Sequence, residues 1–116
     1  MRSLHKIFLL LLVTVISASL LGQSDSARLV GTITDASGAV SPGATVTVTN
    51  LGTGRIVSVQ TNASGEYVVT ELQAGRYHVE VRQTGFKTST ADLTLEVSQI
   101  QQISLQLQAG AVDTTV

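Results

Sequence analysis

The sequence predicts an all-β protein, a seven-stranded antiparallel β-sandwich preceded by the helix of a signal peptide. Three observations lead to this prediction. After residue 22, short runs place an apolar residue at every second position, the period of a strand with one buried face. Glycine-centred turns, as in residues 62–67, separate these runs, and no helical period occurs among them. A chain of 116 residues has room for one domain of this kind.

The N-terminal segment has the pattern of an export signal. Arg2, His5 and Lys6 give it a basic start, and an apolar run follows at residues 7–16. A membrane-spanning helix needs about 20 apolar residues, whereas hydroxyl side chains interrupt this run before that length is reached. We interpret residues 1–22 as a cleaved signal peptide, with an uncleaved anchor as the alternative. The chain contains no cysteine, so neither a lipoprotein anchor nor a disulfide can form.

Turn residues separate the first four predicted strands. After a linker at residues 23–28, we expect strands at residues 29–34, 44–49, 55–61 and 66–70. The turn at residues 35–38 is rich in residues that tolerate positive φ or bond their own backbone. The single proline, Pro42, opens the second strand, and a tight connection at residues 50–54 leads into the third. Gly75 completes the turn that follows the fourth strand.

The last three predicted strands show the clearest alternation. In the fifth, at residues 76–83, apolar side chains share one face and charged side chains share the other. The sixth is defined by Leu93, Leu95 and Val97, and the seventh by Ile103, Leu105 and Leu107. Residues 108–116 depart from the pattern and are expected to form a tail or linker toward a missing downstream domain. The predicted core consists of Ile33, Val46, Val48, Val57, Tyr77, Val79, Val81, Leu95 and Leu105.

The charge balance excludes two classes of partner. Residues 23–116 carry five basic and eight acidic side chains, a formal net charge of −3. Proteins that bind nucleic acids concentrate positive charge along one face, and anionic membrane surfaces attract the same kind of patch. We therefore expect neither nucleic acid nor an anionic membrane surface as a partner.

The residues after the signal peptide offer no arrangement typical of an active site. They contain a single histidine, His78, and no cysteine to act as a nucleophile. His78 and Glu80 share the outward face of the fifth strand, but a zinc site would need two further ligands that the sequence does not supply. We therefore predict a protein that is not an enzyme, with no catalytic, cofactor-binding or metal-binding residue and no cofactor.

Strand addition is one way in which such a sandwich could bind a partner. An open sandwich leaves edge strands with unpaired backbone groups, and this sequence carries little charge to protect them. The strand at residues 93–97 is a candidate edge, with Asp92 and Glu96 as its protection.

Several motifs along the chain resemble those of a known family, the carboxypeptidase regulatory-like domain. They are residues 31–35 with Gly38, residues 42–46, residues 65–67, Leu72 with Gly75 and Tyr77, and residues 85–86. The resemblance covers residues 29–107. It implies a prealbumin or transthyretin-like seven-stranded sandwich, in agreement with the strand count, and a domain without catalytic activity.

The order of segments is similar to the start of one group of bacterial receptors. A signal peptide directly before the domain, and an ending like residues 105–112, resemble the N-terminal extension of TonB-dependent, Oar-like outer-membrane receptors. This resemblance implies an exported accessory or interaction module in the periplasm or outer membrane of a Gram-negative bacterium. Its partner would be an envelope protein or a downstream receptor domain, and it would meet the membrane only through a parent receptor. A truncated receptor product and a free periplasmic module are both open.

Carbohydrate binding is the alternative function, because the sandwich resembles the broad starch-binding-like fold class, and a glycan is then the partner. Sugar recognition usually uses exposed aromatic side chains beside polar groups. The aromatic residues after the signal peptide are Tyr67, Tyr77 and Phe86. Strand parity directs both tyrosines inward, so we expect them to pack in the core.

Overall fold

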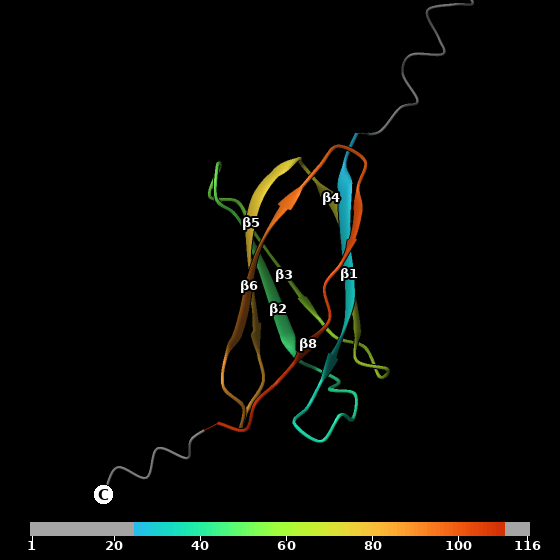
Figure 1. Cartoon of the computed structure of the whole chain (residues 1–116), viewed down its shortest axis with the longest axis vertical. Coiled ribbons are helices and arrows are strands. Elements are labelled where there is room, and N and C mark those ends of the chain that lie inside the picture. The colour runs from blue at the N-terminus through green and yellow to red at the C-terminus, as the bar shows by residue number, and fades with distance from the viewer. Residues whose placement is uncertain (1–24, 111–116) are drawn as a thin grey trace, which may run out of the picture.

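The computed structural model describes residues 25–110, which form two β-sheets packed face to face (Figure 1). These residues contain no helix, so they also contain no helix that could cross a membrane. The predicted signal peptide at residues 1–22, the start of the predicted linker at residues 23–24 and the end of the predicted tail at residues 111–116 lie outside the described residues.

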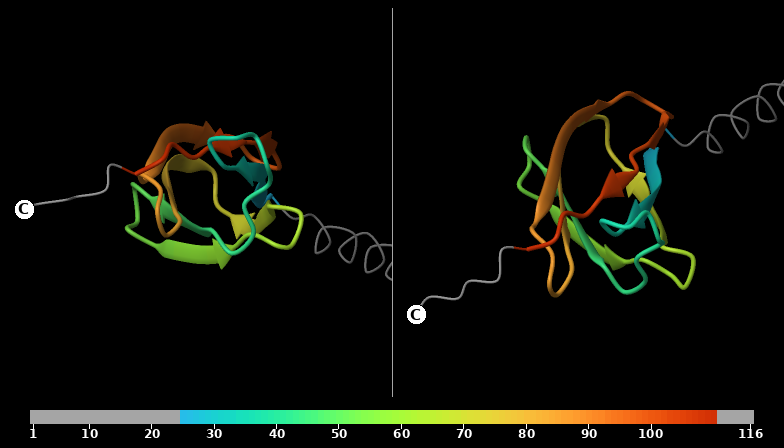
Figure 2. Two further views of the ribbon diagram at one scale, coloured as in Figure 1. Left: turned by 90° about the horizontal axis from the view of Figure 1, so that it is seen from below. Right: turned by 60° about the horizontal axis from the view of Figure 1, so that its bottom comes forward.

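Each sheet contains four strands. The first sheet is built around β1 (Ala27–Thr34), which pairs with β4 (Glu66–Leu72) on one side and with β7 (Ile100–Gln102) and β8 (Leu105–Gln106) on the other. The second sheet has the order β3 (Ile56–Gln60), β2 (Thr45–Asn50), β5 (Gly75–Arg82) and β6 (Ser89–Leu95). Two further views show the two layers facing each other (Figure 2), with the buried core side chains between them. The predicted β-sandwich is therefore confirmed.

The C-terminal third differs in detail from the prediction. The sixth strand occupies Ser89–Leu95, and Val97 lies outside it, in the connection to β7, with 60% of its surface exposed. Ser98, with a φ of 59°, turns the chain from the second sheet toward the first. Of the seventh strand predicted at residues 103–107, only Leu105–Gln106 form a strand, β8, and a short strand that was not predicted, β7, precedes it. The described residues therefore contain eight strands. Both β7 and β8 pair with β1 in parallel, whereas an antiparallel arrangement was expected throughout.

The core follows from the alternation in the strands. Seven of the nine predicted core residues are buried, while Val57 and Leu105 are partly buried and pack against the cluster at its rim. The β5 strand is the clearest example, because its burial alternates residue by residue from Tyr77 to Val81. The buried cluster consists of Ala27, Leu29, Ile33, Ala44, Val46, Val48, Tyr67, Val69, Leu72, Tyr77, Val79, Val81, Leu95 and Leu107.

We call residues 100–107, which include β7 and β8, the C-terminal strand. In the break between β7 and β8, this strand passes very close to Gly31 of β1. A Cβ atom built on Gly31 would lie 1.8 Å from the carbonyl oxygen of Ile103, so only glycine permits this approach. The same oxygen accepts a hydrogen bond from the hydroxyl of Tyr67 at 2.6 Å, and the Ile103 amide donates to the carbonyl of Val30 at 2.8 Å. Two strands, β1 and β4, thus meet the segment between β7 and β8 at one carbonyl group.

Side-chain caps hold the turns at the end of the molecule where the loops gather (Figure 1). The Asp35 carboxylate accepts hydrogen bonds from the Ser37 hydroxyl and from the amides of Ser37 and Ala39. The bond from the Ser37 hydroxyl is the largest cause that lowers the pKa of Asp35 below its usual value. The Asn62 side chain caps the next turn in the same way, accepting from the amides of Ser64 and Glu66.

Replacement of Gly31 by alanine is expected to be strongly destabilising. The new methyl group would overlap the Ile103 carbonyl, so β1 and the C-terminal strand would have to separate, at a cost of about 2–4 kcal/mol in the free energy of unfolding. Urea denaturation measures this loss. Gly52→Ala is the matched control, because its Cβ would meet only a side-chain oxygen at 3.4 Å. Equal stabilities of the two variants would contradict the assignment.

The stability of the sandwich is expected to fall at alkaline pH through Tyr67. Burial raises the pKa of Tyr67 from its ordinary value of 10.0 to about 12. The folded protein therefore keeps a proton that the unfolded chain releases, so the stabilisation is complete below pH 10.0 and is lost as the pH rises toward 12. Denaturation curves of the wild-type protein and of Tyr67→Phe isolate this effect. A wild-type stability that declines no faster than that of Tyr67→Phe would show that Tyr67 ionises normally.

Candidate functional site

The outward side of the second sheet carries a set of polar side chains from all four of its strands. The alternation that buries Tyr77 and Val79 in β5 directs His78, Glu80 and Arg82 to the opposite side. We call this surface the polar face. Its polar members are Thr45, Thr47, Thr49, Ser58, Gln60, Arg76, His78, Glu80, Arg82, Thr90, Asp92 and Thr94.

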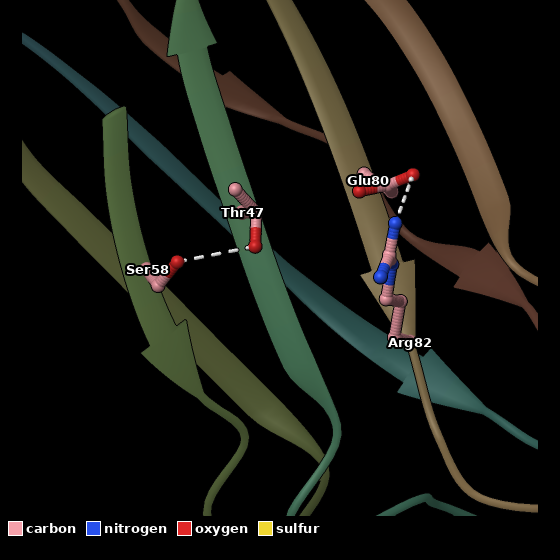
Figure 3. Close-up of polar contacts among 4 residues, drawn as sticks. All are labelled: Thr47, Ser58, Glu80 and Arg82. Atoms are coloured by element: carbon pink, nitrogen blue, oxygen red, sulfur yellow. Dashed lines mark hydrogen bonds and ion pairs between the residues drawn. The ribbon is translucent and has the colours of Figure 1, made fainter. Parts of the chain in front are cut away.

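Cross-strand register sets which of these side chains meet. Thr47 lies between Ser58 of β3 and Glu80 of β5, and its hydroxyl is 3.1 Å from that of Ser58 (Figure 3). Along β5, an Arg82 guanidinium nitrogen donates to a Glu80 carboxylate oxygen at 3.2 Å (Figure 3). These contacts lie in solvent, where an exposed ion pair contributes between 0 and about 1 kcal/mol.

The one histidine among the described residues pairs across the sheet. His78 of β5 stands opposite Asp92 of β6, and its Nδ1 atom is 2.5 Å from a carboxylate oxygen of Asp92. Glu80, two residues along the same strand, shares the outward face with His78 as expected, but it bonds Arg82 instead of His78. The partner of His78 is set by the β5–β6 register, which local sequence does not reveal. Within residues 25–110, no group of three or more His, Asp or Glu side chains could hold a metal ion.

The aromatic side chains divide into two buried residues and one partly buried residue. Tyr67 and Tyr77 are each 3% exposed, which confirms the prediction that they pack in the core. The Tyr77 hydroxyl donates to the carbonyl of Gln73 at 2.6 Å and accepts from the Asn50 side chain at 3.2 Å. Phe86 is partly buried against the core and borders a shallow open groove. The groove is lined by Gly43, Thr45, Arg82, Gln83, Thr84, Phe86 and Thr88.

The edges of the sheets form the remaining candidate sites. The second sheet ends with β3 on one side and β6 on the other, and no further strand of the described residues pairs with either. The predicted edge at residues 93–97 is therefore an edge in its first part, which belongs to β6. Asp92 lies in this strand, whereas Glu96 follows it.

One known protein family matches most of the described residues. Residues 28–108 match the family described as the carboxypeptidase regulatory-like domain. No curated protein matches the chain.

Several solved structures share the fold at low sequence identity. The Bacillus anthracis TIE protein is 19% identical, with a TM-score of 0.63 over 73% of this chain and 17% of that protein. Mercury-inhibited catechol 1,2-dioxygenase from Acinetobacter sp. ADP1 is 14% identical, with a TM-score of 0.65 over 83% of this chain and 57% of the enzyme. For 3-chlorocatechol 1,2-dioxygenase from Rhodococcus opacus 1CP the identity is 8% and the TM-score 0.60, over 76% and 62% of the two chains. The chain thus spans only part of each of these proteins.

Proposed function

We propose that this chain, which belongs to the family of carboxypeptidase regulatory-like domains, is an exported, non-catalytic interaction module of the cell envelope. In this proposal it forms the N-terminal extension of a TonB-dependent outer-membrane receptor of a Gram-negative bacterium. The observation that carries the proposal is the order of segments, since an apolar leader at residues 7–16 precedes a family domain at residues 28–108.

The two ends of the described chain lie at opposite ends of the sandwich, which supports a domain placed between a preceding and a following segment. Asp25 is tied to the β6–β7 connection at one end of the sandwich, where its carbonyl accepts from the Ser98 amide at 3.1 Å. Gly110 is tied to Gly85 at the opposite end, with its amide 3.0 Å from the Gly85 carbonyl oxygen (Figure 1). A chain that enters at one end and leaves at the other can connect a preceding and a following segment without bending back.

The chemistry of the polar face supports a role without catalysis. The side chains of His78 and Asp92 are 39% and 69% exposed, so their pair lies in water on an open sheet. Activated nucleophiles and bases work in sites that exclude water and aim donors at the developing charge. An exposed surface of threonine hydroxyls and paired ions is better suited to contact with another macromolecule.

Export is the part of this proposal that a substitution tests most directly. Leu10→Arg would interrupt the apolar run, so the full chain should remain in the cytoplasm, whereas the wild-type chain is exported and shortened. Cell fractionation and N-terminal sequencing measure both effects. Leu51→Arg is the control, because Leu51 is 51% exposed in a turn and its replacement should leave export unchanged.

Export alone would not identify the parent protein. Sequencing of the gene beyond the codon for Val116 supports the receptor assignment if a plug and barrel are encoded there. Unrelated sequence after a stop codon, or cytoplasmic wild-type protein in the fractionation, would contradict it.

A glycan-binding module is the second candidate function, and the groove beside Phe86 favours it. The aromatic residue Phe86 lines this groove together with Arg82, Gln83 and three threonines. The Gln83 side chain is held in place, because its amide donates to the Pro42 carbonyl at 2.9 Å. Sugar sites combine an apolar ring surface with a few fixed polar groups in this way.

Glycan binding predicts a specific loss in one variant. Arg82→Ala should weaken retention on an acidic polysaccharide by about tenfold, the effect of roughly 1.4 kcal/mol, since a charged hydrogen bond is lost. Affinity electrophoresis measures the retention. Arg28→Ala is the matched control, because Arg28 lines a different open groove, together with Thr70, Glu71 and Gln99. Failure of the wild-type protein to bind any polysaccharide tested would exclude this second function.

A further inference from the structure

The edge strand β3 directs a row of backbone groups away from the molecule. The Asn50 amide donates to the carbonyl of Arg55 at 2.8 Å, and the Thr61 amide donates to that of Ala44 at 2.9 Å. In an antiparallel ladder, hydrogen-bonded and non-hydrogen-bonded pairs alternate. The backbone groups of Val57 and Val59 therefore bond β2, whereas those of Ile56, Ser58 and Gln60 point outward from the sheet.

The side chains of β3 are also more open than those of the neighbouring strands. Ile56 is 63% exposed on the side of the polar face. Val57 and Val59 point toward the core but remain partly exposed, whereas Val46 and Val48 of β2 are fully buried. Three apolar side chains along the free edge thus remain at least partly exposed, one on the polar face and two on the core side.

Every other edge of the described sandwich has a protecting feature. The β4 edge carries Glu66 and Glu71, and the β6 edge carries Asp92. The remaining edge is divided into β7 and β8, of three and two residues. Proteins protect edge strands in these ways, with charges, prolines or short and interrupted strands. The sequence of β3, Ile-Val-Ser-Val-Gln, contains no charged residue and no proline.

We propose that β3 is an interface at which a second copy of this chain pairs, antiparallel and with two-fold symmetry about Ser58. In this register Ser58 faces the partner's Ser58, and Ile56 faces the partner's Gln60. On the core side, Val57 faces the partner's Val59. Two four-stranded sheets then continue as one sheet of eight strands. This inference goes beyond the proposed function, which it neither requires nor excludes.

A second copy fits this edge because the strand is complementary to itself. The register pairs valine with valine on the core side and brings no like charges together, and apolar cross-strand pairs are favourable. The symmetric pairing of β6 about Asp92 would instead place two carboxylates opposite each other. A self-complementary patch gives a closed dimer, since each copy uses the same surface.

The mass of the assembly tests the interface. The chain is expressed in full, isolated from cells and examined by sedimentation equilibrium over a wide range of concentrations. Wild-type protein should show a monomer–dimer equilibrium. Ser58→Lys should weaken dimerisation by about fivefold, because two ammonium groups would lie directly opposite each other across the strand pair.

The matched control is Thr90→Lys, which makes the same change on the opposite edge. The Leu51 amide donates to the Arg76 carbonyl at 2.9 Å, so alternate residues of β5 bond β2 and the free row of β6 contains Thr90 and Asp92. Thr90→Lys should dimerise like the wild-type protein. A monomer at every concentration, or dimerisation lost in Thr90→Lys and kept in Ser58→Lys, would overturn the proposal. Growth beyond a dimer would do so as well.

Disulfide crosslinking tests the register. The natural sequence has no cysteine, so Ser58→Cys introduces a single thiol per chain. Directly opposed, hydrogen-bonded residues have Cα atoms about 5.5 Å apart, within the range that a disulfide spans. Under mild oxidation, Ser58→Cys should crosslink faster than either Gln60→Cys or Thr90→Cys. Equal rates for all three variants would contradict the two-fold register about Ser58.

Discussion

The sandwich depends on one close approach, that of the Ile103 carbonyl to the backbone of Gly31. This contact places the C-terminal strand against β1, and it interrupts that strand so that β7 and β8 pair with β1 on either side of it. The Tyr67 hydroxyl binds the same carbonyl from β4, so the central strand and both of its neighbours are tied at one point. A buried carbonyl without partners would be costly, and here it is satisfied by a side chain instead of a ladder amide.

The candidate sites lie on the second sheet, because its outward face and both of its edges are free. The first sheet is tied together by the Gly31 contact, whereas the second presents an open polar face and two free edges. Its side chains make short-range pairs, such as Arg82 with Glu80, that remain exposed to water. Such a surface is consistent with an interaction module. The unprotected β3 edge is the one feature of the sheet that specifies a geometry for a partner, because backbone groups and partly exposed valines both lie there.

Local patterns in the sequence predicted most of the fold. Alternation in β5 correctly predicted both the buried Tyr77 and the outward His78, and the turn residues marked the hairpins. Pairing between distant segments could not be predicted in this way. Parallel pairing of β7 with β1 produces the same alternation as antiparallel pairing, and Asp92 is fourteen residues from His78. Gly31 also gave no sign of the Ile103 contact, since a glycine in a strand has several possible causes.

Native-state hydrogen exchange of the Ile103 amide tests the central claim most directly. This amide bonds the Val30 carbonyl at 2.8 Å, in a break between strands of three and two residues near the end of the described chain. If the Gly31 contact holds the sandwich together, the amide exchanges only through global unfolding, with the same free energy as the amides of β5. Exchange through a local opening that requires much less free energy would show that the C-terminal strand frays independently, and would contradict this account.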